Sequence, residues 1–250
     1  MHGGNRLRAL RDALVTLLLV LAASPIARAC GPDALGTART LSLDTSGGPQ
    51  FGLKQYARTL PLGDREVVLT FDDGPHHGVT PRVLDALARE CVKATFFLIG
   101  RNAAALPGLT ARIARDGHTL ANHTFSHPWT IDRLSHAAAL ADLDRGEDAI
   151  RMASGARVAR FVRFPGFVET PALLSEMTRR NVAVFGTDVW ASDWNVMAPD
   201  VQLRLVLGRI ERARRGIVLF HDIKDQTAAM LPAFLRELKR RGFRVVHVTG

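Results

Sequence analysis

The sequence lacks several features that would assign it to other classes of protein. It has only two cysteines, Cys30 and Cys91, so at most one disulfide can form within the chain. It shows no internal repeat, and it has no recognisable nucleic-acid-binding motif, although its formal net charge is +9. Beyond one apolar stretch near the N-terminus, no segment approaches the length that a membrane span needs. These absences favour one globular domain that neither crosses a membrane nor binds nucleic acid.

The N-terminal residues resemble a Sec signal peptide. They contain, in order, three arginines, an apolar stretch and a small-residue cleavage site: Arg6, Arg8, Arg11, residues 13–23 and Ala27-Arg28-Ala29. We therefore expect residues 1–29 to be removed and the mature protein to be periplasmic or extracellular, with an uncleaved membrane anchor as the alternative. The segment has four arginines against one aspartate, a net +3, which leaves about +6 on the mature chain. This excess favours approach to anionic polymers such as cell-wall material.

The two cysteines leave alternatives open. If cleavage follows Ala29, Cys30 becomes the first mature residue, and it could pair with Cys91 or carry lipid. The preceding residues form a poor lipobox, because a bulky aliphatic residue is expected at Ala27 and a small one at Arg28. Cys91 by itself is typical of a small core residue.

Two adjacent carboxylates stand at the end of a short apolar run. Asp72 and Asp73 follow residues 67–71, and Gly74-Pro75 breaks the run directly afterwards. This pattern predicts a buried strand with both acids at its C-terminal end, where α/β proteins usually place their active sites. Taken alone, Asp-Asp-Gly-Pro is more typical of a turn.

His123 and His127 are a candidate pair of metal ligands. They are four residues apart, so one helix-like turn would point both imidazoles the same way, and a carboxylate could complete three protein ligands. Two histidines and one acid form a catalytic zinc pattern, which leaves a position for a water whose pKa the metal lowers to about 7. One aspartate can then be a ligand while the other removes the water's proton. An isolated His-x-x-x-His is weak evidence, since His-Pro often ends a helical turn.

Together and in this order, the motifs resemble those of the polysaccharide deacetylases with a NodB-homology domain, also called carbohydrate esterase family 4. The resemblance extends from about Glu66 to the end of the chain. Five motifs carry it: residues 70–75, residues 123–128, Arg163-Phe164-Pro165, Asp193-Trp194 and Leu219-Phe220-His221.

The resemblance implies a metal site and a general base. Asp73, His123 and His127 would hold one divalent cation, expected to be Zn²⁺, with Co²⁺, Mn²⁺, Fe²⁺ or Ni²⁺ as alternatives. Asp72 would be the base. An arginine fork can fix a carboxylate with two hydrogen bonds, and this is the role implied for Arg163.

It also implies a general acid and a pocket for the acetyl group. His221 would protonate the leaving amine, and a hydrogen bond to Asp193 would raise its pKa and fix its tautomer. A backbone amide near Gly166 would help the metal to stabilise the oxyanion. The substrate pocket would be formed by Trp194, Leu219, Pro165 and Gly166.

The chain departs from the family pattern at two places. Many relatives have Arg-Pro-Pro-Tyr in the third motif, whereas this chain has Gly166-Phe167 after Pro165 and lacks the tyrosine. Relatives often have an acid three residues before Asp193, where this chain has Trp190. Because these positions line the groove, the departures bear on which substrate is bound.

The order of predicted elements indicates an α/β fold. With 250 residues, 47% of them hydrophobic, the chain can form one substantial core. Predicted strands at 67–71, 94–99, 182–185, 217–220 and 243–248 alternate with predicted helices at 81–90, 109–115, 134–152, 171–180, 201–214 and 227–240. Alternation implies a parallel sheet, open or closed. The family resemblance implies a distorted (β/α) barrel with the active site at the C-terminal ends of its strands. The expected division is a signal peptide (1–29), an irregular leader packing partly on the barrel (30–65) and the catalytic domain (66–250).

The sequence therefore predicts an exported, monomeric, metal-dependent hydrolase. It would remove acetyl groups, expected to be N-acetyl, from a polysaccharide such as peptidoglycan, chitin oligomers or an exopolysaccharide, by attack of a metal-bound water. Three alternatives remain at this point: an inactive cell-wall glycan-binding protein of the same fold, an O-acetyl esterase acting on xylan-type polymers, and a non-heme iron oxygenase, which also uses two histidines and one acid.

Overall fold

The computed structural model describes residues 30–250, so the predicted signal peptide lies outside the described residues. The strands are β1 (Thr37–Ser42), β2 (Gln50–Phe51), β3 (Glu66–Asp72), β4 (Thr95–Leu98), β5 (Thr119–Asn122), β6 (Phe161–Val162), β7 (Ala183–Phe185), β8 (Val189–Trp190), β9 (Gly216–His221) and β10 (Arg244–Thr249). The helices are α1 (Thr80–Arg89), α2 (Gly100–Ala105), α3 (Pro107–Arg115), α4 (His136–Ser154), α5 (Pro171–Arg180), α6 (Pro199–Ala213) and α7 (Asp225–Arg240), with short 3₁₀ turns at Ile131–Arg133 and Pro165–Phe167.

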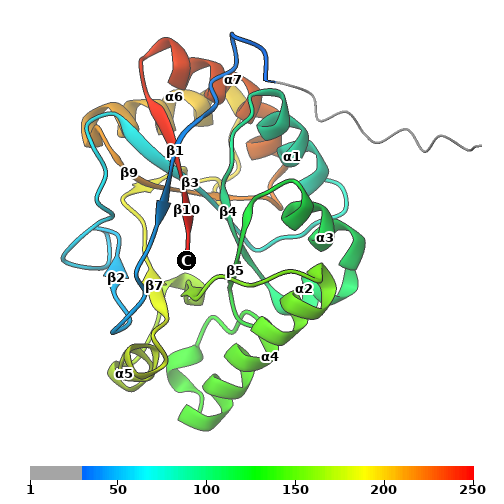
Figure 1. Ribbon diagram of the computed structural model, residues 1–250, viewed down its shortest axis with the longest axis vertical. Coiled ribbons are helices and arrows are strands. Elements are labelled where there is room, and N and C mark those ends of the chain that lie inside the picture. The colour runs from blue at the N-terminus through cyan, green and yellow to red at the C-terminus, as the bar shows by residue number, and fades with distance from the viewer. Residues whose placement is uncertain (1–29) are drawn as a thin grey trace, which may run out of the picture.

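The strands pair in parallel, and the helices surround them (Figure 1). The pairings run β8-β9-β3-β4-β5-β6-β7, while β10 and β1 extend from β3 and β2 extends from β7. Among the described strands, β7 and β8 do not pair with each other, so the hydrogen-bonded ring is interrupted there. Parallel strands with crossover helices confirm the expected α/β fold.

Strand register brings the functional motifs to one edge of the sheet. Asp72 at the end of β3 is opposite His221 at the end of β9. Asn122 at the end of β5 is opposite Val162 in β6, so His123 and Arg163 follow neighbouring strand ends. Because all these strands are parallel, their C-terminal ends meet at the same edge.

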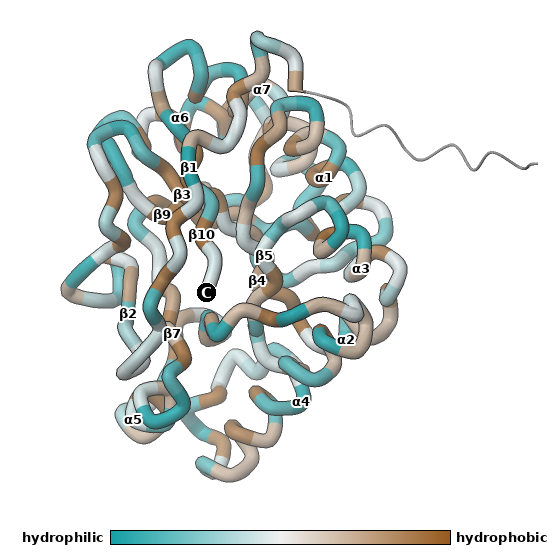
Figure 2. The backbone as a smooth tube through the Cα atoms, in the orientation of Figure 1, coloured by the Kyte–Doolittle hydropathy of each residue, from teal (hydrophilic) through white to brown (hydrophobic). Residues whose placement is uncertain are grey.

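The core has two layers that meet at β3. Val67, Leu69 and Phe71 pack outward against the helices, and Val68 packs into a second cluster made largely of strand residues. Successive side chains of a strand point to opposite faces, so Asp72 lies on the same inner face as Val68. Hydrophobic residues concentrate along β3, β4 and β9 in Figure 2. No helix within residues 30–250 is long and apolar enough to span a membrane.

The structure differs from the sequence-based expectation in several short elements. β5, β6, β8 and α2 were not expected, since they span two to six residues and have no sustained hydrophobic period. Residues 30–65 are also more regular than expected. This segment contributes β1, which pairs along β10, and it buries Leu60 and Leu62 in the inner cluster.

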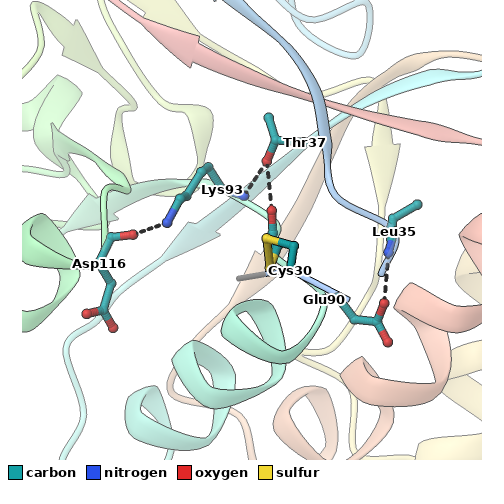
Figure 3. Close-up of a disulfide and its surroundings, with 7 residues drawn as sticks. Cys30, Leu35, Thr37, Glu90, Lys93 and Asp116 are labelled. Carbon is teal, nitrogen blue, oxygen red and sulfur yellow. Dashed lines mark hydrogen bonds between the residues drawn. A yellow bond between two sulfur atoms is a disulfide. The ribbon is translucent and has the colours of Figure 1, made fainter. Parts of the chain in front are cut away.

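A disulfide joins Cys30 to Cys91, with an S–S distance of 2.05 Å (Figure 3). The expectation that Cys91 is a small core residue is therefore wrong, because its sulfur is bonded and the residue is half-buried. Thr37 adds to this attachment by accepting a hydrogen bond from the Lys93 amide at 2.8 Å. The start of the described chain is thus fixed to the connection between α1 and β4, at the edge of the sheet opposite to the strand ends described above.

Candidate active site

The turn after β3 is shaped by a buried carboxylate from the turn after β9. Asp73 has a φ of 75°, and Gly74 precedes a cis proline. Asp222 accepts hydrogen bonds from the Gly74 amide at 3.1 Å and from the Thr80 hydroxyl at 2.6 Å. A Cβ atom on Gly74 would overlap the Asp222 carboxylate, so only glycine fits here. This packing fixes the path of the chain directly after the two aspartates.

Asp73, His123 and His127 come together as three possible metal ligands, here called the ligand group. One atom from each lies within 4.8 Å of the others. Asp73 Oδ1 is 3.2 Å from His127 Nε2 and 3.4 Å from His123 Nε2. The expected helix-like turn is wrong, because the histidines lie on a loop after β5 in which Thr124 and His127 have positive φ. The loop, rather than helical spacing, directs both rings to the same point.

Hydrogen bonds hold this loop and orient the first histidine. His123 Nδ1 donates to the Arg163 carbonyl at 2.6 Å, which leaves Nε2 to face the ligand group. Such a bond to the far ring nitrogen fixes the tautomer and the orientation of a metal-binding histidine. Asp142 accepts from the amides of Phe125 and Ser126, both at 3.1 Å.

The ligand group fits a divalent cation. Among the described residues, Asp73 Oδ1 is one of four buried side-chain polar atoms with no hydrogen-bond partner. Burial would raise the pKa of Asp73, but His123 and His127 beside it outweigh that effect and hold the pKa well below its ordinary value. A buried anionic oxygen facing two imidazole nitrogens is satisfied by a cation, and one oxygen with two nitrogens suits Zn²⁺ and related ions.

Asp72 is fixed by Arg163, though not by the expected pair of hydrogen bonds. Arg163 is fully buried, and its Nη1 donates to Asp72 Oδ1 at 2.6 Å and to Thr70 Oγ1 at 3.0 Å. Nε and Nη2 instead donate to the carbonyls of Phe185 and Gly186, at 3.2 and 2.8 Å. The expected fork is therefore wrong, because the carbonyls of Phe185, at the end of β7, and of Gly186, directly after it, occupy the remaining donors. Asp72 Oδ2 is left facing the ligand group.

His221 and Asp193 form a second pair beside the ligand group. His221 Nδ1 donates to Asp193 Oδ1 at 2.7 Å, and Asp193 Oδ2 accepts from the His221 amide and the Thr227 hydroxyl at the same distance. Burial would lower the pKa of His221, but Asp193 and the charge of Asp73 outweigh it and raise the pKa to about 9. His221 Nε2 points into the site, 4.0 Å from Asp73 Oδ2.

These groups open into one cleft of about 320 Å³. Its lining residues are Asp72, His123, His127, Trp129, Phe164, Gly166, Phe167, Trp190, Trp194, Leu219 and His221. Trp194, Leu219 and Gly166, which the sequence assigned to a substrate pocket, line this cleft, whereas Pro165 is buried and is not part of the lining.

Several residues of this site were not assigned from the sequence. Trp129 and Phe164 line the cleft, and a signal for each was available, because both stand inside or directly after a motif. Asp222 likewise follows His221 directly. Thr227 carries no comparable signal, because only the packing of α7 against β9 brings it to Asp193.

This chain is similar to known proteins in both its sequence and its fold. The family described as "Polysaccharide deacetylase" matches residues 60–184. A chitooligosaccharide deacetylase of Bradyrhizobium sp. is 35% identical over 198 residues, covering 73% of this chain and 89% of the relative. A peptidoglycan-N-acetylglucosamine deacetylase of Bacillus cereus is 35% identical over 195 residues, covering 76% of this chain and 70% of the relative.

The fold is similar to that of a solved peptidoglycan deacetylase of Bdellovibrio bacteriovorus. The TM-score is 0.77 at 33% identity, and the match covers 85% of this chain and 58% of that protein. Solved neighbours of this kind confirm the barrel-like arrangement of strands and helices. The chain therefore belongs to the polysaccharide deacetylase family, and it is a hydrolase of that family.

Proposed function

We propose that the protein is exported, binds one divalent cation at the ligand group, and removes N-acetyl groups from polymers that contain N-acetylglucosamine. One observation carries this proposal. Asp72, His123, His127 and His221 line a single cleft, and both the carboxylate of Asp72 and the imidazole of His221 lie within about 4 Å of the ligand group. Hydrolysis of an amide requires both a group that takes up a proton and one that delivers it.

Asp73, His123 and His127 would hold the cation, and we propose that it is Zn²⁺. When bound, such an ion lowers the pKa of a coordinated water and polarises a carbonyl. Metal analysis of protein purified without added zinc tests the identity of the ion. Zinc at one equivalent per chain is the expected result, and iron, cobalt, manganese or nickel in its place would contradict it.

Asp72 would take the proton from the attacking water. Its Oδ1 is held by Arg163, and its Oδ2 is directed toward the ligand group, so the carboxylate presents one oxygen in one orientation. Arg163 itself cannot turn away, because three other acceptors hold its guanidinium. This arrangement preorganises the base before substrate binds.

His221 would give a proton to the departing amine. Its Nδ1 is engaged by Asp193, so the Nε2 proton is the one that faces the cleft. A pKa of about 9 keeps the ring protonated at neutral pH. The Gly166 amide would donate to the oxyanion, while Trp194 and Leu219 would contact the acetyl methyl group.

The substrate and the location are supported by the relatives and by the disulfide. The printed names of the Bradyrhizobium and Bacillus cereus relatives are those of deacetylases of chitooligosaccharide and of peptidoglycan N-acetylglucosamine. A disulfide persists in oxidising compartments outside the cytoplasm, which supports export. The bond between Cys30 and Cys91 also uses the sulfur that a lipid would need, so we propose a protein without a lipid on Cys30.

Acetate release from a panel of polymers tests this function. We expect release from chitin oligomers or peptidoglycan, and little from O-acetylated xylan. Asp72→Asn should abolish release while the metal stays bound. Glycan binding without acetate release from any polymer would instead favour a protein that only binds the cell wall, and substrate-dependent oxygen consumption would favour an oxygenase.

A further inference from the structure

A pocket on the flank of the barrel is distinct from the cleft of the candidate active site. It lies where the ring of strands is interrupted, because residues 186–188 join β7 to β8 without a crossover helix. In a (β/α) barrel a helix usually covers each such connection from outside. Here the space forms a pocket of about 430 Å³, which we call the flank pocket. Its lining residues are Lys54, Asp188, Val189, Trp190, Arg209, Arg212 and Ala213.

The walls of the flank pocket are fixed by hydrogen bonds. In the loop after β2, the Lys54 amide donates to the Thr187 carbonyl at 3.0 Å. From α6, Arg209 Nη1 donates to the Trp190 carbonyl at 2.7 Å and to the Ser192 hydroxyl at 2.6 Å. The loop and the helix are therefore both held to β8 and its flanking residues, so the pocket is formed before any ligand binds. A binding site held in advance loses little conformational entropy when it is occupied.

Asp188 is the one acid of the flank pocket, and the fold already uses its carboxylate. Oδ1 accepts a hydrogen bond from the Leu53 amide at 2.7 Å, and Oδ2 accepts from the Ile217 amide at 2.7 Å and from the Thr59 hydroxyl. Both oxygens thus hold the loop after β2 and the start of β9. The carboxylate makes no ion pair with the positive side chains of the pocket.

Three positive side chains line the flank pocket without an acidic partner. Lys54 and Arg212 are exposed, and Arg209 is half-buried. Within residues 30–250, no carboxylate oxygen lies within 4.0 Å of the charged nitrogen atoms of these three side chains. By contrast, Arg204 earlier in α6 is paired with Asp200 at 2.7 Å. Unpaired cations gathered around one pocket favour an anionic ligand.

The balance of charge favours an anion with more than one negative charge. Three cations against the Asp188 carboxylate leave an excess of about two positive charges. The C-terminal end of α6 contributes about half a negative charge, which reduces this excess without removing it. A phosphate monoester carries about −1.5 to −2 at neutral pH, whereas one carboxylate carries only −1. A guanidinium can also bind two phosphate oxygens at once.

The size and the position of the flank pocket fit a phosphate that is attached to a larger molecule. Its volume falls in the range of ligand-binding pockets, about 300–1,000 Å³, and so leaves room for the group that carries the phosphate. Trp190 lines both the flank pocket and the cleft. A polymer whose acetylated sugar is in the cleft would therefore lie beside the flank pocket.

We propose that the flank pocket binds a phosphate monoester group carried by the glycan polymer, with Lys54, Arg209 and Arg212 as its partners. The bound phosphate would anchor the polymer next to the cleft and takes no part in the removal of the acetyl group. The statement about the polymer rests on the proposed function, whereas the phosphate site itself does not.

Calorimetric titration of the metal-loaded protein with inorganic phosphate tests the site. We expect Lys54→Ala/Arg212→Ala to raise the Kd of one phosphate-binding event about tenfold or more, because each side chain supplies a charge-assisted hydrogen bond. The matched control is Arg179→Ala/Arg204→Ala, which removes two exposed positive charges that do not line the pocket. Phosphate bound to the metal would bind equally in both double variants. All four side chains are exposed, so thermal unfolding of both variants should match the parent's.

Two outcomes of the titration would overturn the phosphate site. One is an equal phosphate affinity in the two double variants. The other is tighter binding of propionate than of phosphate, with the same dependence on Lys54 and Arg212, which would make the ligand a carboxylate.

Acetate release from a phosphorylated glycan, before and after phosphatase treatment, distinguishes phosphate on the polymer from free phosphate. At one fixed ionic strength, we expect the parent protein to have a KM about fivefold lower for the phosphorylated glycan, with kcat unchanged. This difference should disappear in Lys54→Ala/Arg212→Ala and persist in the control variant. An equal KM for both glycans in the parent protein would refute binding of the polymer's phosphate. No acetate release from either glycan would defeat the proposed function alone, because calorimetry decides the phosphate site by itself.

Discussion

Asp72 and Asp73 are neighbours in the chain, but their surroundings give them different chemistry. Asp72 is the last residue of β3 and is held by a buried arginine. Asp73 has left-handed backbone and faces two imidazoles. The change of backbone conformation between them is what turns one carboxylate toward Arg163 and the other toward the histidines.

Substitution of each aspartate by asparagine should therefore have distinct effects. Asp73→Asn would remove the anionic member of the proposed ligand group, so we expect the affinity for the metal to fall by about a hundredfold or more. Asp72→Asn would remove the proposed base and should lower kcat by about 10²–10⁴-fold while metal affinity stays near that of the parent. Equilibrium metal titration and steady-state kinetics of both variants measure this. Equal loss of metal in the two variants would refute the division of roles.

The pH dependence of turnover should report on the His221–Asp193 pair. A general acid works while it is protonated, so activity falls as pH rises through its pKa. Asp193 helps to raise that pKa to about 9, and loss of its charge should move the alkaline limb of the kcat profile to lower pH by about one unit or more. We expect this shift in Asp193→Asn and none in Asp225→Asn, which alters an exposed carboxylate on α7. An alkaline limb at the same pH in all three proteins would argue against His221 as the acid.

The connection between β3 and α1 depends on close contact between Gly74, in the turn after β3, and Asp222, in the turn after β9. Asp222 is fully buried and bonded to Thr80, so it cannot move aside for a side chain on Gly74. We expect Gly74→Ala to lower the free energy of unfolding by about 1–3 kcal/mol and to weaken metal binding, because Asp73 is adjacent.

Urea unfolding of Gly74→Ala measures the loss of stability, with Gly108→Ala as the control. Gly108 is in α3 with open space around it, so alanine there should be neutral or slightly stabilising. Similar loss of stability in both variants would show that the approach to Asp222 is unimportant.

Across the whole molecule, the disulfide and β1 attach the first described residues to the barrel. The bond closes a loop between residues 61 apart in sequence, and loss of such a loop constraint costs roughly 4 kcal/mol in the chain-entropy description. Cys30→Ser/Cys91→Ser should therefore lower the free energy of unfolding by up to about this amount. It should leave kcat nearly unchanged, because the bond is at the edge of the sheet opposite the cleft.

Chemical denaturation measures the stability of the double variant, and acetate release measures its kcat. The parent protein is measured in the same two ways, with and without reductant. A loss of kcat in the folded double variant would show that attaching residues 30–65 to the barrel through the disulfide affects catalysis at the active site.

Some of this structure followed from local sequence signals alone. Helix α5 has its predicted bounds, Pro171–Arg180, because Thr170 caps its first turn, proline opens it, and Asn181 ends it in a left-handed conformation. The apolar run before Asp72 and the Gly-Pro after Asp73 likewise identify a strand and its end. Such signals act over a few residues, so the sequence is sufficient to read them.

The features that depended on tertiary structure are contacts between residues far apart in the chain. The motif residues were identified from the sequence, but their contacts were not. The partners of Arg163, the support from Asp222, the pairing of β1 with β10 and the gathering of the three tryptophans depend on strand register and loop path. The sequence by itself determined which chemical groups are present and in which order. Only the folded barrel decided which of them meet, because parallel strands distant in sequence end at a common edge.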